Sequence, residues 1–91
     1  MQQLRCYKEF PVWSQQAIPQ GFKQPHNTKA GTWAKLTVLK GELHFAMLDQ
    51  SGHIQSEHVF TPEQQPPFIE PQVWHKIISA SEDAECQLRF Y

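Results

Sequence analysis

Apolar and polar residues alternate along much of this chain with the period of two that is typical of half-buried β-strands. The alternation is clearest in "ELHFAML" (42–48), where every second residue from Leu43 to Met47 is large and apolar. Apolar and β-branched residues also fill "TWAKLTVLK" (32–40). Apolar repeats at the helical spacing are rare, and seven prolines interrupt the chain. The predicted strands are 32–40, 42–48, 53–60, 67–70, 73–79 and 86–91.

Turn residues separate these segments. Gly41 in "KGE" predicts a tight hairpin between the first two strands. "DQSG" (49–52) predicts a second turn, and the acidic "SEDAE" (81–85) predicts a third. Short strands with turns every ten residues or so are typical of a sandwich, a jelly roll or a small barrel. We therefore expect an all-β fold.

The stretch 11–31 has a looser pattern. We expect it to form an arm or long loop that lies across the strands and is anchored by Trp13, Ile18 and Phe22. The predicted organisation is one domain over 1–91, with an arm and loop region in 1–31 and barrel strands in 32–91.

The composition is that of a globular protein without a basic surface. Of the 91 residues, 40% are hydrophobic and 19% are charged, and the formal net charge is -1. Without a basic run, neither nucleic acid nor an anionic membrane is an expected partner. No apolar run reaches the roughly 18 residues of a membrane span, and the first residues lack a signal peptide's apolar stretch, so we expect a cytoplasmic protein. There, Cys6 and Cys86 should be free thiols.

Two histidines are candidates for chemistry. His26 lies in the turn before the long strand 32–40, and His75 lies in "EPQVWHKI" near the start of a later strand. Neutral imidazole is a ligand for zinc, iron and nickel, and Glu70, five residues before His75, supplies a candidate carboxylate. The simpler alternatives are a packed strand histidine at position 75 and an exposed loop histidine at position 26.

Other residues carry weaker signals. Trp33, Phe45 and Trp74 are candidate pocket walls, although each tryptophan also suits plain packing against a strand. The remaining histidines are expected at surface positions; they are His44, His53 and His58. No nucleophile–base arrangement and no glycine-rich phosphate loop is present in the sequence.

Several blocks resemble a known family in order along the chain. They are "CYKEFPVW", "HNTKAGTWAKLTVLKGELHF", "EHVFTPE" and "PFIEPQVWHKI". Over residues 5–91 they resemble the small N-terminal domain of TehB-type tellurite-resistance proteins. "VLKGEL" and "EPQVWH" also resemble the two half-motifs of the cupin superfamily.

The resemblance implies a cupin-like double-stranded β-helix, a jelly-roll barrel with a pocket between its sheets. The first half-motif then assigns His26 as a ligand, and the second assigns His75. The other usual cupin ligands fall near Lys29 and Ala34, which do not ligate, so Glu70 is the candidate substitute. The methyltransferase part of the TehB-type family is not matched by these residues, and methyl transfer is not carried over.

Three functions are consistent with this sequence. The first is a small pocket domain, associated by resemblance with tellurite resistance, that binds a small oxyanion or a divalent transition metal (zinc, iron or nickel). The second is a non-catalytic accessory or dimerisation module, and the third is a metal-dependent enzyme such as a dioxygenase. Open sheet edges predict a homodimer. A shared ion predicts that the rings of His26 and His75 lie within about 5 Å of each other.

Overall fold

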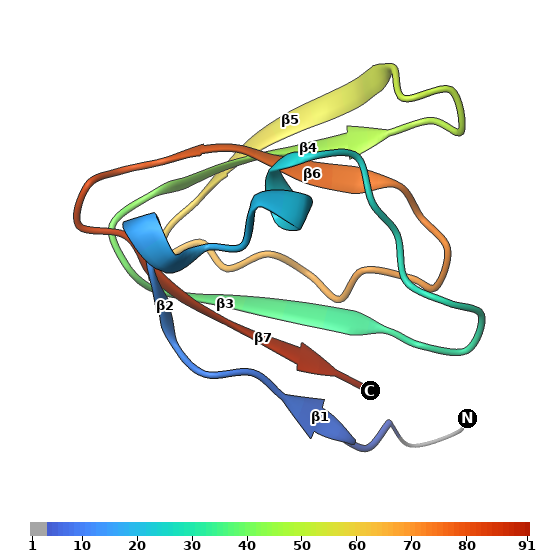
Figure 1. Cartoon of the computed structure of the whole chain (residues 1–91), viewed down its shortest axis with the longest axis horizontal. Coiled ribbons are helices and arrows are strands. Elements are labelled where there is room, and N and C mark those ends of the chain that lie inside the picture. Colours follow the sequence, from blue (N-terminus) through green and yellow to red (C-terminus); the bar gives the residue numbers. More distant parts are fainter. Residues whose placement is uncertain (1–3) are drawn as a thin grey trace.

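Two antiparallel β-sheets face each other across a hydrophobic core in the computed structural model, which describes residues 4–91 (Figure 1). In one sheet β7 pairs with β3 along its length and with β1 and β2 near its two ends; in the other, β4 lies between β5 and β6. The strands are β1 (Lys8–Glu9), β2 (Trp13–Ser14), β3 (Ala34–Lys40), β4 (Leu43–Leu48), β5 (Ile54–Phe60), β6 (His75–Ala80) and β7 (Glu85–Phe90). Two short 3-10 helices are η1 (Gln15–Ala17) and η2 (Gln20–Lys23). The expected all-β architecture is confirmed.

The alternation of buried and exposed residues along the strands shows where the core lies. Ala34, Leu36 and Val38 of β3 are buried, and so are Leu43 and Phe45 of β4. These side chains extend from the two facing sheets, so the core forms between the sheets rather than on one side of a single layer.

The prediction of a hairpin around Gly41 is wrong. β3 and β4 belong to different sheets, because Gly41 (φ 75°) carries the chain across the core instead of folding it back. The turn is held against the loop between β6 and β7. The Glu42 N–H donates to Ser81 Oγ (2.9 Å), and the Ser81 N–H donates to the Glu42 carbonyl (3.0 Å). The second expected turn does form a hairpin, with the Asp49 N–H bonded to the His53 carbonyl (2.9 Å) between β4 and β5.

The loop between β5 and β6 runs along the outer edge of β3. The side chain of Gln65 accepts a hydrogen bond from the Val38 N–H (2.8 Å) and donates one to the Val38 carbonyl (2.7 Å). Ile69 forms a backbone bridge with Ala34. The segment 67–70 therefore contributes one bridge and not the expected strand, and the edge of β3 is covered.

The N-terminal segment is pinned to the barrel by pairing and by aromatic packing. Its strands β1 and β2 pair with β7, and Ile18 is buried in the core. The rings of Trp13 and Phe22 pack 5.4 Å apart against that core.

Both cysteines are free, Cys6 at the surface and Cys86 in the interior. Within residues 4–91 no helix has the length and apolar character needed to cross a membrane.

Gly41 and Gly52 form a matched pair for testing the crossover. Both have positive φ, but a Cβ at Gly41 would lie 2.9 Å from the Ala84 Cα, whereas nothing lies within 4 Å of a Cβ at Gly52. The left-handed conformation costs an alanine about 1–2 kcal/mol at either position, and overpacking adds about 1–3 kcal/mol at Gly41 alone. We predict that Gly41→Ala lowers the free energy of unfolding in urea by about 2 kcal/mol more than Gly52→Ala. Equal losses would show that the crossover has no packing constraint.

Candidate functional site

A small cavity of about 50 Å³ lies between the two sheets. Most of its lining is apolar and comes from β3, β4, β6, β7 and the N-terminal segment. Its two imidazoles belong to His26 and His75. The volume suits an ion or a small group of atoms rather than a bulky substrate.

Backbone pairing brings the two histidines together. The His26 N–H donates to the His75 carbonyl (3.0 Å), and the His75 N–H donates to the His26 carbonyl (2.9 Å). His75 is the first residue of β6 and follows a turn in which Gln72 has a φ of 65°. The short stretch "EPQVWHKI" therefore ends the loop, starts the strand and presents His75 to the core, where only 4% of its surface remains exposed.

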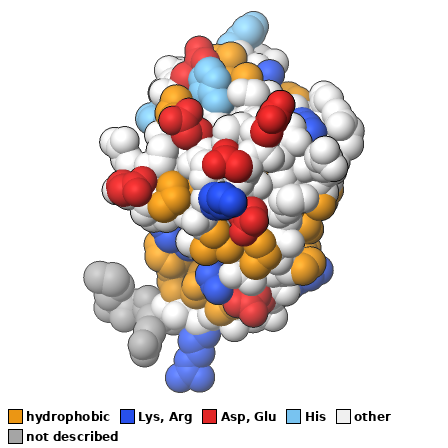
Figure 2. Space-filling view, turned by 90° about the vertical axis from the view of Figure 1, so that its left-hand side faces the viewer, with side chains coloured by type: hydrophobic (Ala, Val, Ile, Leu, Met, Phe, Trp, Pro, Cys, Tyr) orange, Lys and Arg blue, Asp and Glu red, His pale blue; other side chains and the backbone are white. Residues whose placement is uncertain are grey.

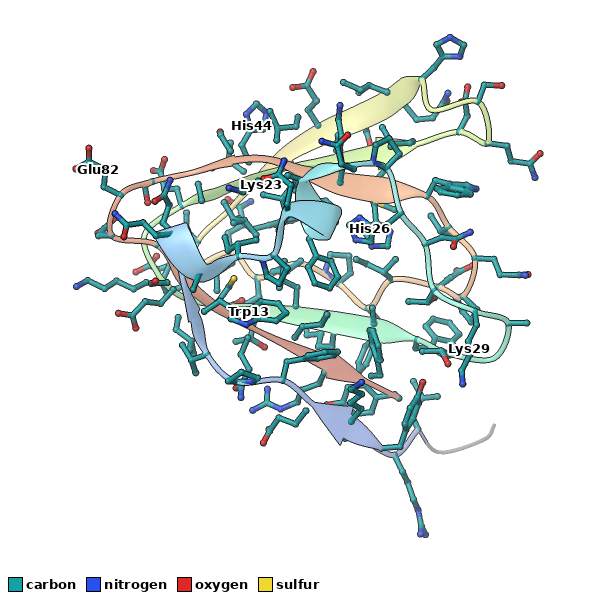
Figure 3. All side chains as sticks on the ribbon, viewed as in Figure 1. Trp13, Lys23, His26, Lys29, His44 and Glu82 are labelled. Carbon is teal, nitrogen blue, oxygen red and sulfur yellow. The ribbon has the colours of Figure 1, made fainter. Side chains whose placement is uncertain are left out.

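The rings meet edge to face, with centroids 4.2 Å apart and planes inclined by 72°. Phe45 stacks on His75 (5.5 Å between centroids), and Phe22 meets His26 edge-on (5.0 Å). Figure 3 shows His26 in the space between the sheets, on the side where the N-terminal segment crosses. The predicted proximity of the two rings is confirmed.

Each ring is oriented by a hydrogen bond from Nδ1. His75 Nδ1–H donates to the Val73 carbonyl (2.8 Å), and His26 Nδ1–H donates to the Gln24 carbonyl (2.9 Å). A carbonyl can only accept, so in each neutral ring the proton is on Nδ1 and the lone pair is on Nε2. Both rings thus keep Nε2 available as a ligand or a hydrogen-bond acceptor.

Burial keeps the rings uncharged. Desolvation is the largest cause that lowers the pKa of His75 to about 4, and repulsion from His26 lowers it further. Desolvation also lowers the pKa of His26, against a smaller raising effect of its bond to Gln24. At neutral pH the site therefore holds a pair of neutral imidazoles.

The other predicted site residues are mostly elsewhere. Phe45 lines the cavity, but Trp33 and Trp74 do not. Trp33 packs on Phe68 (6.5 Å between centroids), outside the core, because Ala34 takes the inward position beside it. Trp74 precedes an inward-facing His75 and so belongs to the opposite face of the strand.

Glu70 does not join the histidines. Its side chain is exposed and lies outside the cavity lining. Residues 4–91 contain no group of three or more His, Cys, Asp and Glu side chains that could hold a metal ion. The expected set of His26, His75 and Glu70 is therefore reduced to the two imidazoles, because Pro71 and the turn after it keep the carboxylate on the surface.

The sequence reasoning missed part of the pocket wall. Trp13 and Phe22 line the cavity, and they were predicted only as anchors of an arm. Cys86 also lines it, and burial raises the pKa of this thiol to about 11. The alternation of apolar residues in 86–91 was a signal for Cys86, since it shares its face with the buried Leu88.

The remaining histidines make contacts outside the cavity. His44 Nε2 lies 2.9 Å from Glu57 Oε1, and His53 Nδ1 lies 3.4 Å from Asp49 Oδ2. His58 is hydrogen-bonded to a serine on its own strand.

The sequence matches the TehB-like domain over residues 8–88. The chain belongs to the TehB-like domain family. Two proteins of Haemophilus influenzae, from strains 10810 and KW20/Rd, are 53% and 54% identical to it over 89 residues. Each is named "Probable S-adenosyl-L-methionine-dependent methyltransferase TehB". These matches cover 98% of this chain and 31% of each relative, so the chain spans about a third of their length.

Solved structures agree with the TehB-like fold. The crystal structure of TehB from H. influenzae superimposes with a TM-score of 0.91 at 53% identity, over 94% of this chain and 30% of that one. A crystal structure of an Escherichia coli K12 protein superimposes with a TM-score of 0.80 over 99% of this chain and 95% of that one. At 22% identity, this second similarity shows a shared fold.

Because His75 is buried in its neutral form, we expect the folded protein to lose stability in acid. Its folded pKa of about 4 lies below the ordinary value of 6.5, so the unfolded chain takes up the proton first as the pH falls. The contribution of His75 to stability is therefore complete above pH 6.5 and is lost between pH 6.5 and 4. We predict that the free energy of unfolding of the parent falls by about 3 kcal/mol more over this window than that of His75→Asn. Asparagine is chosen because its amide N–H can still reach the Val73 carbonyl. Urea unfolding at several pH values tests this, and parallel pH profiles would contradict it.

Proposed function

We propose that this TehB-like domain binds a divalent transition metal through Nε2 of His26 and His75. The observation that carries the proposal is that both Nδ1 atoms are committed to backbone carbonyls while the rings touch. A hydrogen bond from the non-ligating nitrogen to a carbonyl is the usual support of a metal-binding histidine. Zinc, iron and nickel all accept such ligands, and they remain the metals we expect.

The protonation state supports a metal better than an anion bound by the rings. Metal ligands must be neutral imidazoles, and burial keeps His75 in that form. Binding an oxyanion to this ring would require protonation, at a cost of roughly 4 kcal/mol at pH 7 for a pKa of about 4.

Two protein ligands leave positions open on a tetrahedral ion. Catalytic metal sites commonly use three protein ligands and one open position. The residues described here offer two, which favours a binding role over the alternative of a metal-dependent enzyme such as a dioxygenase. Water or a small ligand would complete the coordination.

Membership of the family supports a proposal about the broader role of the domain. By resemblance to TehB-type proteins, we propose that the domain contributes to tellurite resistance. The relatives' names describe probable S-adenosyl-L-methionine-dependent methyltransferases, whereas this chain corresponds to 31% of their length. We therefore propose ligand binding, and not methyl transfer, for these 91 residues. The free thiols support a cytoplasmic location.

Calorimetry with tag-free protein tests the metal site. We predict saturable binding of one zinc ion per chain and at least about tenfold weaker binding by His26→Ala and by His75→Asn, since each removes one Nε2 ligand. Glu70→Gln is the matched control and should bind as the parent does, because Glu70 lies outside the pocket. Unchanged zinc affinity in either histidine variant would refute the proposal.

A second candidate, a dimerisation module, is favoured by the edge of β5. Among the described strands β5 ends its sheet and pairs only with β4, while the outer edge of β6 is bridged by His26. Ile54 and Val59 on β5 are 47% and 49% exposed. An uncovered edge with apolar side chains can pair with a second copy.

We predict a homodimer in light scattering at micromolar concentration, with a mass near twice the 10.6 kDa of one chain. Val59→Lys should shift it toward monomer, because a lysine on an open edge disfavours edge-to-edge pairing. Leu39→Lys, at an exposed apolar residue of β3, is the control. A monomer mass for the parent would end this candidate.

A further inference from the structure

We propose that a shallow groove beside the histidine cavity binds a small oxyanion through Lys8 and Lys29. The groove has a volume of about 350 Å³ and is formed by β1, the end of β7 and the loop before β3. This inference goes beyond the metal-binding proposal and does not depend on it.

The groove gathers hydrogen-bond donors without any carboxylate. Besides the two lysines, its lining offers the hydroxyls of Tyr7 and Thr32 and the amide of Asn27. No aspartate or glutamate lines it, although the chain has nine acidic residues and a formal net charge of -1. A concave surface with two ammonium groups and neutral donors attracts an anion.

The donors are held near the groove by packing. Lys29 Nζ lies 5.9 Å from the centroid of the Tyr7 ring, and Lys8 Nζ lies 4.9 Å from that of Phe10. Contacts of this kind restrain a long side chain. The Tyr7 hydroxyl and Thr32 Oγ1 are 2.8 Å apart, and this bond uses only one of their two protons. The other proton is available to a ligand.

An acidic face around Glu82 lies far from Lys29. Figure 3 places Lys29 and Glu82 at opposite ends of the long axis, and Figure 2 shows acidic side chains gathered on the face at the Glu82 end. An anion is therefore repelled from the Glu82 face, whereas the lysine groove has no carboxylate in its lining.

The groove also adjoins the cavity. Asn27, Thr28 and Phe90 line both, so the two spaces lie against the same wall. The neutral imidazoles do not attract an anion, whereas the lysines next to them do. The oxyanion expected from the sequence is thus assigned to this neighbouring groove. Two lysines match a single small anion rather than a polyanionic chain such as nucleic acid.

Titration of the full chain with inorganic phosphate and with tellurite, followed by backbone amide NMR, tests the proposal. We expect saturable shifts of amides in 27–32 and, for Lys8→Gln/Lys29→Gln, affinity weaker by about tenfold or more, because two charge-assisted contacts are lost. Lys40→Gln is the charge control and should bind as the parent does, since Lys40 lies outside the groove lining.

Three outcomes would overturn the inference: no saturable shift in the parent, an equal loss in Lys40→Gln, or unchanged affinity in the double variant. His75→Asn separates the two proposals. It should lose zinc binding and keep phosphate binding, so failure of the metal site leaves this result intact. Binding of tellurite without phosphate would identify a selective groove, and binding of both would identify a general oxyanion groove; each supports the inference.

Discussion

The backbone bridge between His26 and His75 is the contact on which the rest of the site depends. Its two hydrogen bonds attach the N-terminal segment to the edge of β6 and thereby close the space between the sheets. The same bridge places two imidazoles side by side, and each ring is oriented by the carbonyl of the residue two positions before it. One pair of backbone bonds, about 1 kcal/mol each in net stability, thus organises both the wall of the cavity and its chemistry.

The five long strands and the two histidines were predictable from the sequence because they depend on local pattern. Alternation located β3, β4 and β7 to within a residue or two. The positions of His26 and His75 made them candidates, and the family resemblance then assigned both as ligands. The partners of each strand were not predictable in this way. A glycine between two strands permits either a hairpin or a crossover to the other sheet. Which of the two forms depends on how the apolar faces of the strands pack together in the core.

Two of the three predicted pocket-wall residues were wrong for a related reason, and only Phe45 lines the cavity. Trp33 and Trp74 were selected for their size and their position near a motif. Successive residues of a strand point to opposite faces, however, and Ala34 and His75 take the inward positions beside them. Trp13 and Phe22 reach the cavity from a segment without strong periodicity, so their place depends on the pairing of β2 with β7. Glu70 is near His75 in sequence, yet a proline turn between them directs the carboxylate outward.

The loop between β5 and β6 illustrates how a segment without regular structure can still keep register. Gln65 and Ile69 are four residues apart, and their partners on β3, Val38 and Ala34, are four residues apart in the opposite direction. The loop therefore follows β3 as an antiparallel neighbour would, with a side-chain amide standing in for a peptide group at one end. Surface loops usually tolerate changes of length in evolution. Here an insertion or deletion between positions 65 and 69 would break that register, so length variation among homologues should be confined to the residues on either side.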